Sequence, residues 1–222
     1  FTTSAIVPSY RYDSRDNPYD TTRGTRASMS VSYTGGPLGG TINMIKPIVN
    51  LSRFHKLSPR TIFSFNAEAG QIFPQDDDNC VHFLEDLDQE NRQLCVPRSE
   101  RFYLGGEQSL RGFKSFSISP EEDVDGNGQM VGVGGHKYAT FNLEYIYRIN
   151  DPLRFVLFAD AGQAYGFQED WDLSALRYSA GAEIRIYLPV FQFPLRFIYA
   201  SNLDPQPNDR FESFQFSVGS TF

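Results

Sequence analysis

The sequence predicts an all-β fold, a transmembrane antiparallel β-barrel, from three observations. Aromatic residues make up 15% of the 222 residues, with twenty Phe and twelve Tyr beside one Trp, a composition typical of strands. Apolar and polar residues alternate with a period of two along most of the chain. The sequence has no run of about 18 apolar residues, so it offers no candidate transmembrane helix.

In the first third of the chain, this alternation predicts four strands. Residues 4–13 alternate loosely, and residues 26–33 alternate strictly. Residues 41–56 form a long predicted strand with a defect at Pro47. Because proline cannot donate a hydrogen bond to a ladder, a bulge or a sheet edge is expected there. Residues 61–73 alternate again.

Alternation returns at residue 137 and predicts five more strands. They cover residues 140–148, 154–162, 177–188, 195–199 and 214–222. The chain therefore has about nine predicted strands, many of them about ten residues or longer, whereas strands of globular proteins typically have about 5–6 residues.

Two arrangements of these strands are considered. In a soluble sandwich or lipocalin-like barrel the apolar faces point inward, whereas in a membrane barrel they point at lipid and the polar faces line a wet lumen. The polar faces carry many charges: Glu68, Glu144, Asp160, Arg177, Glu183, Arg185 and Arg196. Such charges, and the short turns at 150–152 and 189–194 opposite long loops, favour the outer-membrane barrel.

The longest segment without regular alternation runs from about residue 74 to about residue 136, a length that usually indicates function. Within it, Arg101–Phe113 is rich in glycine, arginine and aromatic residues. Arg111 is its focus, because a permanently charged planar guanidinium seeks carboxylates in a fixed geometry.

Two cysteines, Cys80 and Cys95, lie in the same segment, and a disulfide between them is the favoured interpretation. A disulfide indicates an oxidising compartment or the cell exterior. Two free thiols are the alternative. Although His82 lies close to Cys80, two cysteines without further ligands at metal spacing make a weak zinc site, and no metal site is predicted.

Other polar motifs carry little chemistry. Asp123–Gly128 resembles the start of a calcium loop, but the distal glutamate is missing because position 134 is glycine, so a turn is expected. The three histidines, His55, His82 and His136, are scattered and suggest no catalytic triad. Neither enzymatic activity nor a cofactor is predicted.

Four motifs in chain order resemble the BamA-type outer-membrane insertase superfamily. They are Arg101–Phe113 with its Arg-Gly-Phe tip, Asn142–Tyr145, Phe158–Gly162 and the closing Phe214–Phe222. The turns at Arg15–Pro18 and Gly35–Gly40 are also similar to those of the family. The resemblance covers nearly all 222 residues in order and is therefore specific.

The resemblance implies that the long loop folds back into the barrel lumen as a re-entrant plug. Its tip, Arg111, Gly112 and Phe113, would contact Glu144 and Asp160 on the inner wall of the next two strands, as a loop-to-wall ionic latch. The alternation agrees, because both carboxylates lie on the polar faces of their strands. The alternative is that both are ordinary solvated charges of the lumen.

The resemblance also implies a barrel of about 16 strands preceded by periplasmic POTRA domains. The first residues have no apolar stretch typical of a signal peptide, and by these motifs residue 1 is expected near the middle of that barrel. We therefore expect residues 1–222 to be the C-terminal part of one barrel domain, about 8–9 strands with the extracellular loop 74–136, without POTRA domains. A small closed barrel of the last eight or so strands would be filled by side chains and leave little room for the loop.

The function implied by the resemblance is folding and insertion of other β-barrel proteins into the outer membrane through a seam beside the last strand. The terminal signal strand would form one side of it: Phe214, Phe216, Val218, Gly219 and Phe222. Expected partners are outer-membrane lipids, unfolded β-barrel client proteins and accessory assembly proteins. The net charge of −7 argues against nucleic acid. Alternatives are a polypeptide translocation pore of the same superfamily and a short structural barrel.

Overall fold

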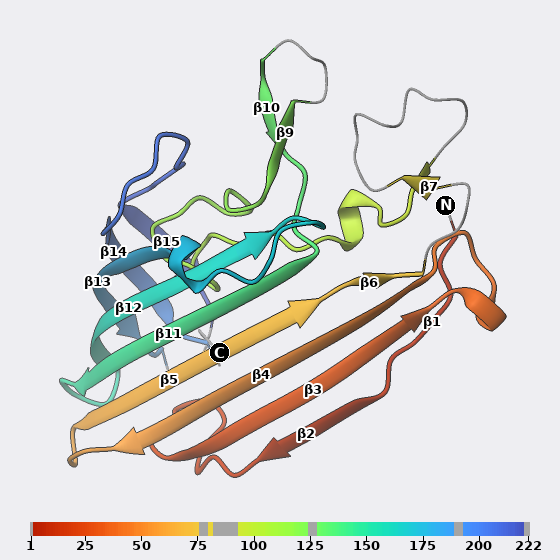
Figure 1. Cartoon of the computed structure of the whole chain (residues 1–222). Helices are drawn as coiled ribbons and strands as arrows, with labels where there is room; N and C mark the ends of the chain where they lie inside the picture. The colour runs from red at the N-terminus through yellow and green to blue at the C-terminus, as the bar shows by residue number, and fades with distance from the viewer. Residues whose placement is uncertain (1, 76–79, 82–92, 124–127, 189–192, 220–222) are drawn as a thin grey trace.

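A computed structural model describes residues 2–75, 80–81, 93–123, 128–188 and 193–219 (Figure 1). Within these ranges one antiparallel sheet contains 11 strands. They are β1 (Ala5–Ile6), β2 (Ser9–Asp13), β3 (Gly24–Thr34), β4 (Met44–Lys56), β5 (Thr61–Gln71), β6 (Phe73–Pro74), β11 (Lys137–Arg148), β12 (Leu153–Tyr165), β13 (Arg177–Ile186), β14 (Leu195–Asn202) and β15 (Phe214–Val218).

The order along the sheet is β1-β3-β4-β5-β11-β12-β13-β14-β15, with β2 beside β3 and β6 beside β4. Consecutive long strands are therefore neighbours, as in a barrel wall. The sheet curls strongly, and β13, β14 and β15 turn away from the plane of β3, β4 and β5 (Figure 1). In the described part of the chain the two edges of the sheet do not pair with each other.

The two faces of the sheet differ in exposure as the membrane-barrel hypothesis predicts. On the convex face Leu143 and Tyr199 are 41% and 62% exposed, although both are apolar or aromatic. On the concave face Glu144 and Asp160 are 1% and 2% exposed. A soluble sandwich would bury its apolar face instead, so this alternative is wrong. No helix in the described ranges has the length and apolarity needed to cross a membrane.

The expected bulge or sheet edge at Pro47 is wrong. The strand β4 is internal, with β3 on one side and β5 and β6 on the other. The antiparallel register is the same before and after the proline: Ile45 pairs with Phe73, and three residues later Ile48 pairs with Gly70, three residues earlier in the partner. Neither strand therefore has an inserted residue. The missing amide coincides with a local gap in pairing, and the amide of Ile72 donates to the carbonyl of His136, the residue before β11.

Most predicted strand ends lie within two or three residues of the observed ones, but the first predicted strand is divided. Residues 4–13 form two short strands, β1 and β2, because Val7 and Pro8 interrupt them. The strand predicted at 177–188 ends at Ile186, and the strand predicted at 195–199 continues to Asn202. Positions 220–222 of the predicted terminal strand lie outside the described residues.

The segment predicted to be irregular contains two small β-pairs and a 3-10 turn in its described part. β7 (Cys80–Val81) pairs in parallel with β8 (Gln93–Leu94), β9 (Glu121–Asp123) forms a hairpin with β10 (Met130–Gly132), and η3 covers Arg98–Glu100. Two further 3-10 turns, η1 (Gly36–Leu38) and η4 (Leu173–Ala175), lie in other loops.

This long loop has an apolar core of its own that packs on the wall. It joins side chains of the loop to side chains of the wall and of its strand ends: Val96, Phe102, Leu104, Leu110, Phe113 and Ile118 with Ile42, Met44, Ile72, Tyr138 and Ala164. Leu110 and Phe113 are fully buried. Burial of apolar surface therefore holds the loop against the concave face.

We expect Leu110→Ala to lower the free energy of unfolding by about 2–5 kcal/mol, because it leaves a cavity between the loop and the wall at Gly162. Urea unfolding of the protein in liposomes measures this change. Leu143→Ala on the convex face is the control and should cost less. Equal losses for the two variants would contradict the packing role of Leu110.

Candidate functional site

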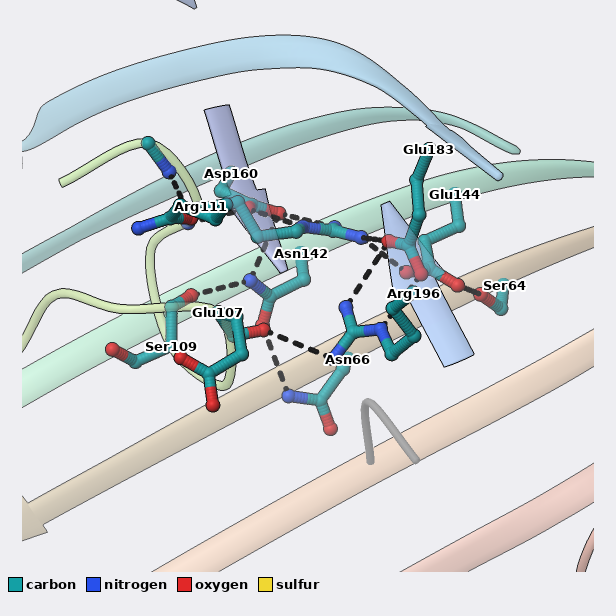
Figure 2. A network of polar contacts seen from close by, with 12 residues as sticks. Ser64, Asn66, Glu107, Ser109, Arg111, Asn142, Glu144, Asp160, Glu183 and Arg196 are labelled. Carbon is teal, nitrogen blue, oxygen red and sulfur yellow. Dashed lines mark hydrogen bonds and ion pairs between the residues drawn. The ribbon is translucent and has the colours of Figure 1, made fainter. Parts of the chain in front are cut away.

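At the tip of the loop, the backbone turn at Gly112 directs the guanidinium of Arg111 toward the wall. Gly112 has a φ of +89°, which non-glycine residues adopt rarely, and an added Cβ would lie 2.5 Å from the ring of Phe211. The buried side chains of Leu110 and Phe113 flank it. The Arg111 side chain consequently points at the concave face, as Figure 2 shows.

Arg111 makes hydrogen bonds to carboxylates of three strands. Its Nε and Nη2 donate to the two oxygens of Asp160 on β12 at 2.8 and 2.7 Å, and its backbone amide donates to Asp160 at 3.1 Å. Its Nη1 donates to Glu144 on β11 at 2.6 Å and to Glu183 on β13 at 3.1 Å. The guanidinium also lies 3.8 Å from the ring centroid of Phe158.

Two further arginines complete the cluster. Arg185 donates to Glu144 and to Glu183, each at 2.5 Å. Arg196 on β14 donates through Nε to Glu183 at 2.7 Å. We call the six side chains the ion cluster: Arg111, Arg185, Arg196, Glu144, Asp160 and Glu183. It contains three guanidinium groups and three carboxylates, so its formal charge is zero.

Neutrality is needed because the ion cluster is buried. None of its side chains is more than 8% exposed. Burial disfavours the charged form of Arg111, yet the charges of Asp160 and Glu144 raise the pKa of Arg111 above its ordinary value. The guanidinium therefore stays charged, and removing one partner of such a buried pair costs about 3–5 kcal/mol.

Amide and hydroxyl groups extend the network to β5 (Figure 2). Asn142 donates to Asp160 at 3.0 Å and to the backbone oxygen of Ser109 at 2.8 Å. Asn66 donates to Asn142 at 3.2 Å, and Ser64 donates to Glu144 at 3.4 Å. The loop tip is thus connected by polar contacts to both sides of β11.

The same tip is clamped to the last described strand, β15. Gln215 accepts a hydrogen bond from the amide of Gly112 at 2.8 Å and donates to the carbonyl of Phe113 at 2.9 Å. Ser217 donates to the Glu107 carboxylate at 3.4 Å. Arg196 on β14 donates to the backbone oxygen of Glu107 at 3.3 Å. Consequently the loop contacts every strand from β11 to β15.

The structure brings together the residues that were predicted to form the latch: Arg111, Gly112, Phe113, Glu144 and Asp160. Their role as a latch remains a proposal. Sequence reasoning missed four residues that join them: Glu183, Arg185, Arg196 and Gln215. All four lie on the polar faces of predicted strands, but their height relative to Arg111 depends on strand register, which the sequence did not show.

The predicted terminal strand is partly described. Phe214, Phe216 and Val218 are 55–58% exposed on the convex face. The backbone amide of Gly219 donates to the carbonyl of Pro194 at 3.1 Å. Phe222 lies outside the described residues.

The other predicted motifs stay outside the ion cluster. Cys95 is buried and disulfide-bonded, whereas the side chain of Cys80 lies outside the described residues, so the pairing stays a prediction. Most of the candidate calcium loop and His82 also lie outside them. Among the described residues, no three His, Cys, Asp or Glu side chains gather to hold a metal ion.

Comparison with known proteins points in one direction. Residues 1–222 match the Omp85 superfamily domain. The outer membrane protein assembly factor BamA of Nitratidesulfovibrio vulgaris is 33% identical over 216 residues, 95% of this chain and 24% of that protein. BamA of Neisseria meningitidis is 30% identical over 156 residues, 57% of this chain and 19% of that protein. The chain thus spans a quarter or less of these curated relatives.

A solved structure shows the same fold. The crystal structure of BamA from Haemophilus ducreyi lacking POTRA domains 1–3 superposes with a TM-score of 0.76 at 22% identity. The match covers 98% of this chain and 42% of that chain. The curled sheet described above therefore has the fold of a part of that protein.

We expect Arg111→Ala to lower the free energy of unfolding by about 3–5 kcal/mol, because three buried carboxylates then face only two guanidinium groups. Arg111→Lys should recover only part of this loss, because an ammonium cannot pair with both oxygens of Asp160 in the same way. Urea unfolding measures both values. Lys114→Ala, at an exposed position three residues along the loop, is the control, and a similar loss there would contradict the prediction.

Gly112→Ala should also destabilise docking of the loop, whereas Gly128→Ala should cost much less. Both glycines have a positive φ, but an added Cβ meets Phe211 and Ala200 at the first position and nothing within 4 Å at the second. The difference between the two variants therefore isolates the effect of crowding from backbone strain. Protease protection of the loop in liposomes reports docking, and equal protection of the two variants would refute the argument.

Proposed function

The chain belongs to the Omp85 superfamily and is an outer-membrane β-barrel protein, and from this premise we propose that the protein containing it folds and inserts other β-barrel proteins into the outer membrane. Residues 1–222 would form the C-terminal part of its one barrel domain, with POTRA domains elsewhere in the protein. The relatives that support this proposal are outer membrane protein assembly factors.

A protein that inserts β-barrels must provide hydrogen-bond partners for the strands of its client. An incoming strand has unpaired backbone groups, and each one costs several kcal/mol in lipid. A strand edge that is free to pair can accept them by β-augmentation. In the described sheet β15 pairs with β14 alone, through five residue pairs. We assign the templating edge to β15.

The contact between the loop tip and β15 is the observation that carries the proposal. A short edge strand whose second edge is free needs another support to keep its position. Gln215 supplies it by bonding to the backbone of Gly112 and of Phe113. Because Arg111 is fixed by the ion cluster, the position of β15 is tied to β11, β12 and β13.

In this function the ion cluster acts as the latch of the loop, without chemical reaction. Its arginines and carboxylates pair with one another, and the proposed activity is not enzymatic. The partners we propose are outer-membrane lipids at the convex face, unfolded β-barrel client proteins at β15, and accessory assembly proteins.

Gln215→Leu should slow client assembly while the barrel remains folded, because it removes both hydrogen bonds to the loop. Each hydrogen bond contributes about 0.5–1.5 kcal/mol, so β15 would lose about 1–3 kcal/mol of positioning. Gln215→Glu keeps the acceptor for Gly112 but loses the donor for Phe113, so its effect should be intermediate. The measurement is the rate of client folding by the full-length protein in liposomes.

Phe216→Leu, one residue along on the convex face, is the matched control and should leave the rate nearly unchanged. Planar-bilayer conductance of the same preparations separates the proposal from a translocation pore. A large open conductance together with normal client folding rates in Gln215→Leu would overturn it.

A further inference from the structure

A row of four arginines crosses the concave face close to the end of the short turns. Arg148 on β11 is in register with Arg154 on β12. Arg154 is in register with Arg185 on β13, and Arg185 with Arg196 on β14. Like charges directly opposite on neighbouring strands are destabilising. The row therefore needs carboxylates, and the ion cluster supplies them to Arg185 and Arg196 only.

The carboxylate for the other half of the row comes from a distant turn. Asp20 lies in the turn 14–23 between β2 and β3, and it pairs with Arg148 and, at 3.0 Å, with Arg154. In the sheet order, β4 and β5 lie between β3 and β11. The turn must therefore reach across the concave side of two strands to make these contacts.

The turn is ordered by its own hydrogen bonds, so it presents Asp20 in a fixed position. Asp16 accepts hydrogen bonds from the backbone amides of Asn17, Thr22 and Arg23. Although slight burial opposes it, these bonds and the Thr22 hydroxyl lower the pKa of Asp16 to about 2. The side-chain oxygen of Asn17 accepts hydrogen bonds from the backbone amides of Tyr19 and, at 3.4 Å, of Asp20.

The turn also lies directly beneath the ion cluster. A cavity of about 60 Å³ is lined by turn residues together with cluster residues, among them Tyr19, Asp20, Glu144 and Arg185. The guanidinium of Arg154 lies 5.1 Å from the ring centroid of Tyr187, which lines the same cavity. The turn and the ion cluster thus face the same cavity, with the turn on the side of the short turns.

We propose that the β2–β3 turn is a strap that closes the concave side at the end of the short turns, with Asp20 as the counter-ion of the Arg148–Arg154 pair. The strap covers the ion cluster on the side opposite the long loop. It also sets the curl of the wall, because it ties the β2–β3 hairpin to β11 and β12. A polypeptide moving along the lumen would have to displace it.

Asp20→Asn tests the strap, because it removes the charge and keeps the size of the side chain. In the full-length protein in liposomes, we expect trypsin cleavage after Arg23 to become about tenfold faster, since cleavage follows the population of the open turn and the variant loses a charge-assisted hydrogen bond that holds the turn closed. Thermal resistance of the barrel should fall in the same variant. Asp151→Asn is the matched control: its backbone oxygen, at 2.8 Å, accepts the hydrogen bond of Arg154.

The double variant Asp20→Asn/Arg148→Gln separates a strap from a general folding defect. Removing Arg148 relieves the repulsion with Arg154, so thermal resistance should recover while cleavage after Arg23 stays fast. It also covers the case in which the single variant fails to fold. Unchanged cleavage in Asp20→Asn, equal acceleration in Asp151→Asn, or no recovery in the double variant would each overturn the proposal.

Discussion

Neutralising one buried guanidinium is the constraint on which the described structure depends. Arg111 is 1% exposed, and its charge is compensated only where Glu144, Asp160 and Glu183 meet. These carboxylates belong to three consecutive strands, so the loop can dock only on a wall whose register is already correct. Conversely, without Arg111 the three carboxylates face only the two guanidinium groups of Arg185 and Arg196. Loop docking and wall geometry are therefore coupled by charge.

Apolar packing and polar contacts have different tasks in this arrangement. The apolar core around Leu110 and Phe113 supplies a non-directional attraction between loop and wall. Directional bonds from Arg111 and from Gln215 then set where the tip sits. Because the second set includes β15, an edge strand of the described sheet, the position of that edge is set by a segment about a hundred residues earlier in the chain. This coupling is what the proposed templating of client strands requires.

The positive charges of the arginine row on the concave face are compensated by carboxylates at two places. The ion cluster serves one half of the arginine row, and Asp20 of the β2–β3 turn serves the other half. Arginines in register would repel one another, yet each finds a carboxylate from the β2–β3 turn or from the strands β11 and β13. The wall is thus closed from the loop side and, in our proposal, from the turn side as well.

The alternation of side chains determined by itself which residues face lipid and which face the lumen, because a period of two leaves one choice once the apolar face is assigned. It placed Glu144, Asp160, Glu183, Arg185 and Arg196 on one face, and motif resemblance selected Arg111 as the tip. What the period could not supply is the height of each residue in the wall, since register depends on pairing across strands. Only the tertiary structure decided that Pro47 sits in an internal strand without a bulge, that Gln215 meets Gly112, and that Asp20 reaches Arg154, because each of these depends on how a twisted sheet curls and brings distant segments to one side.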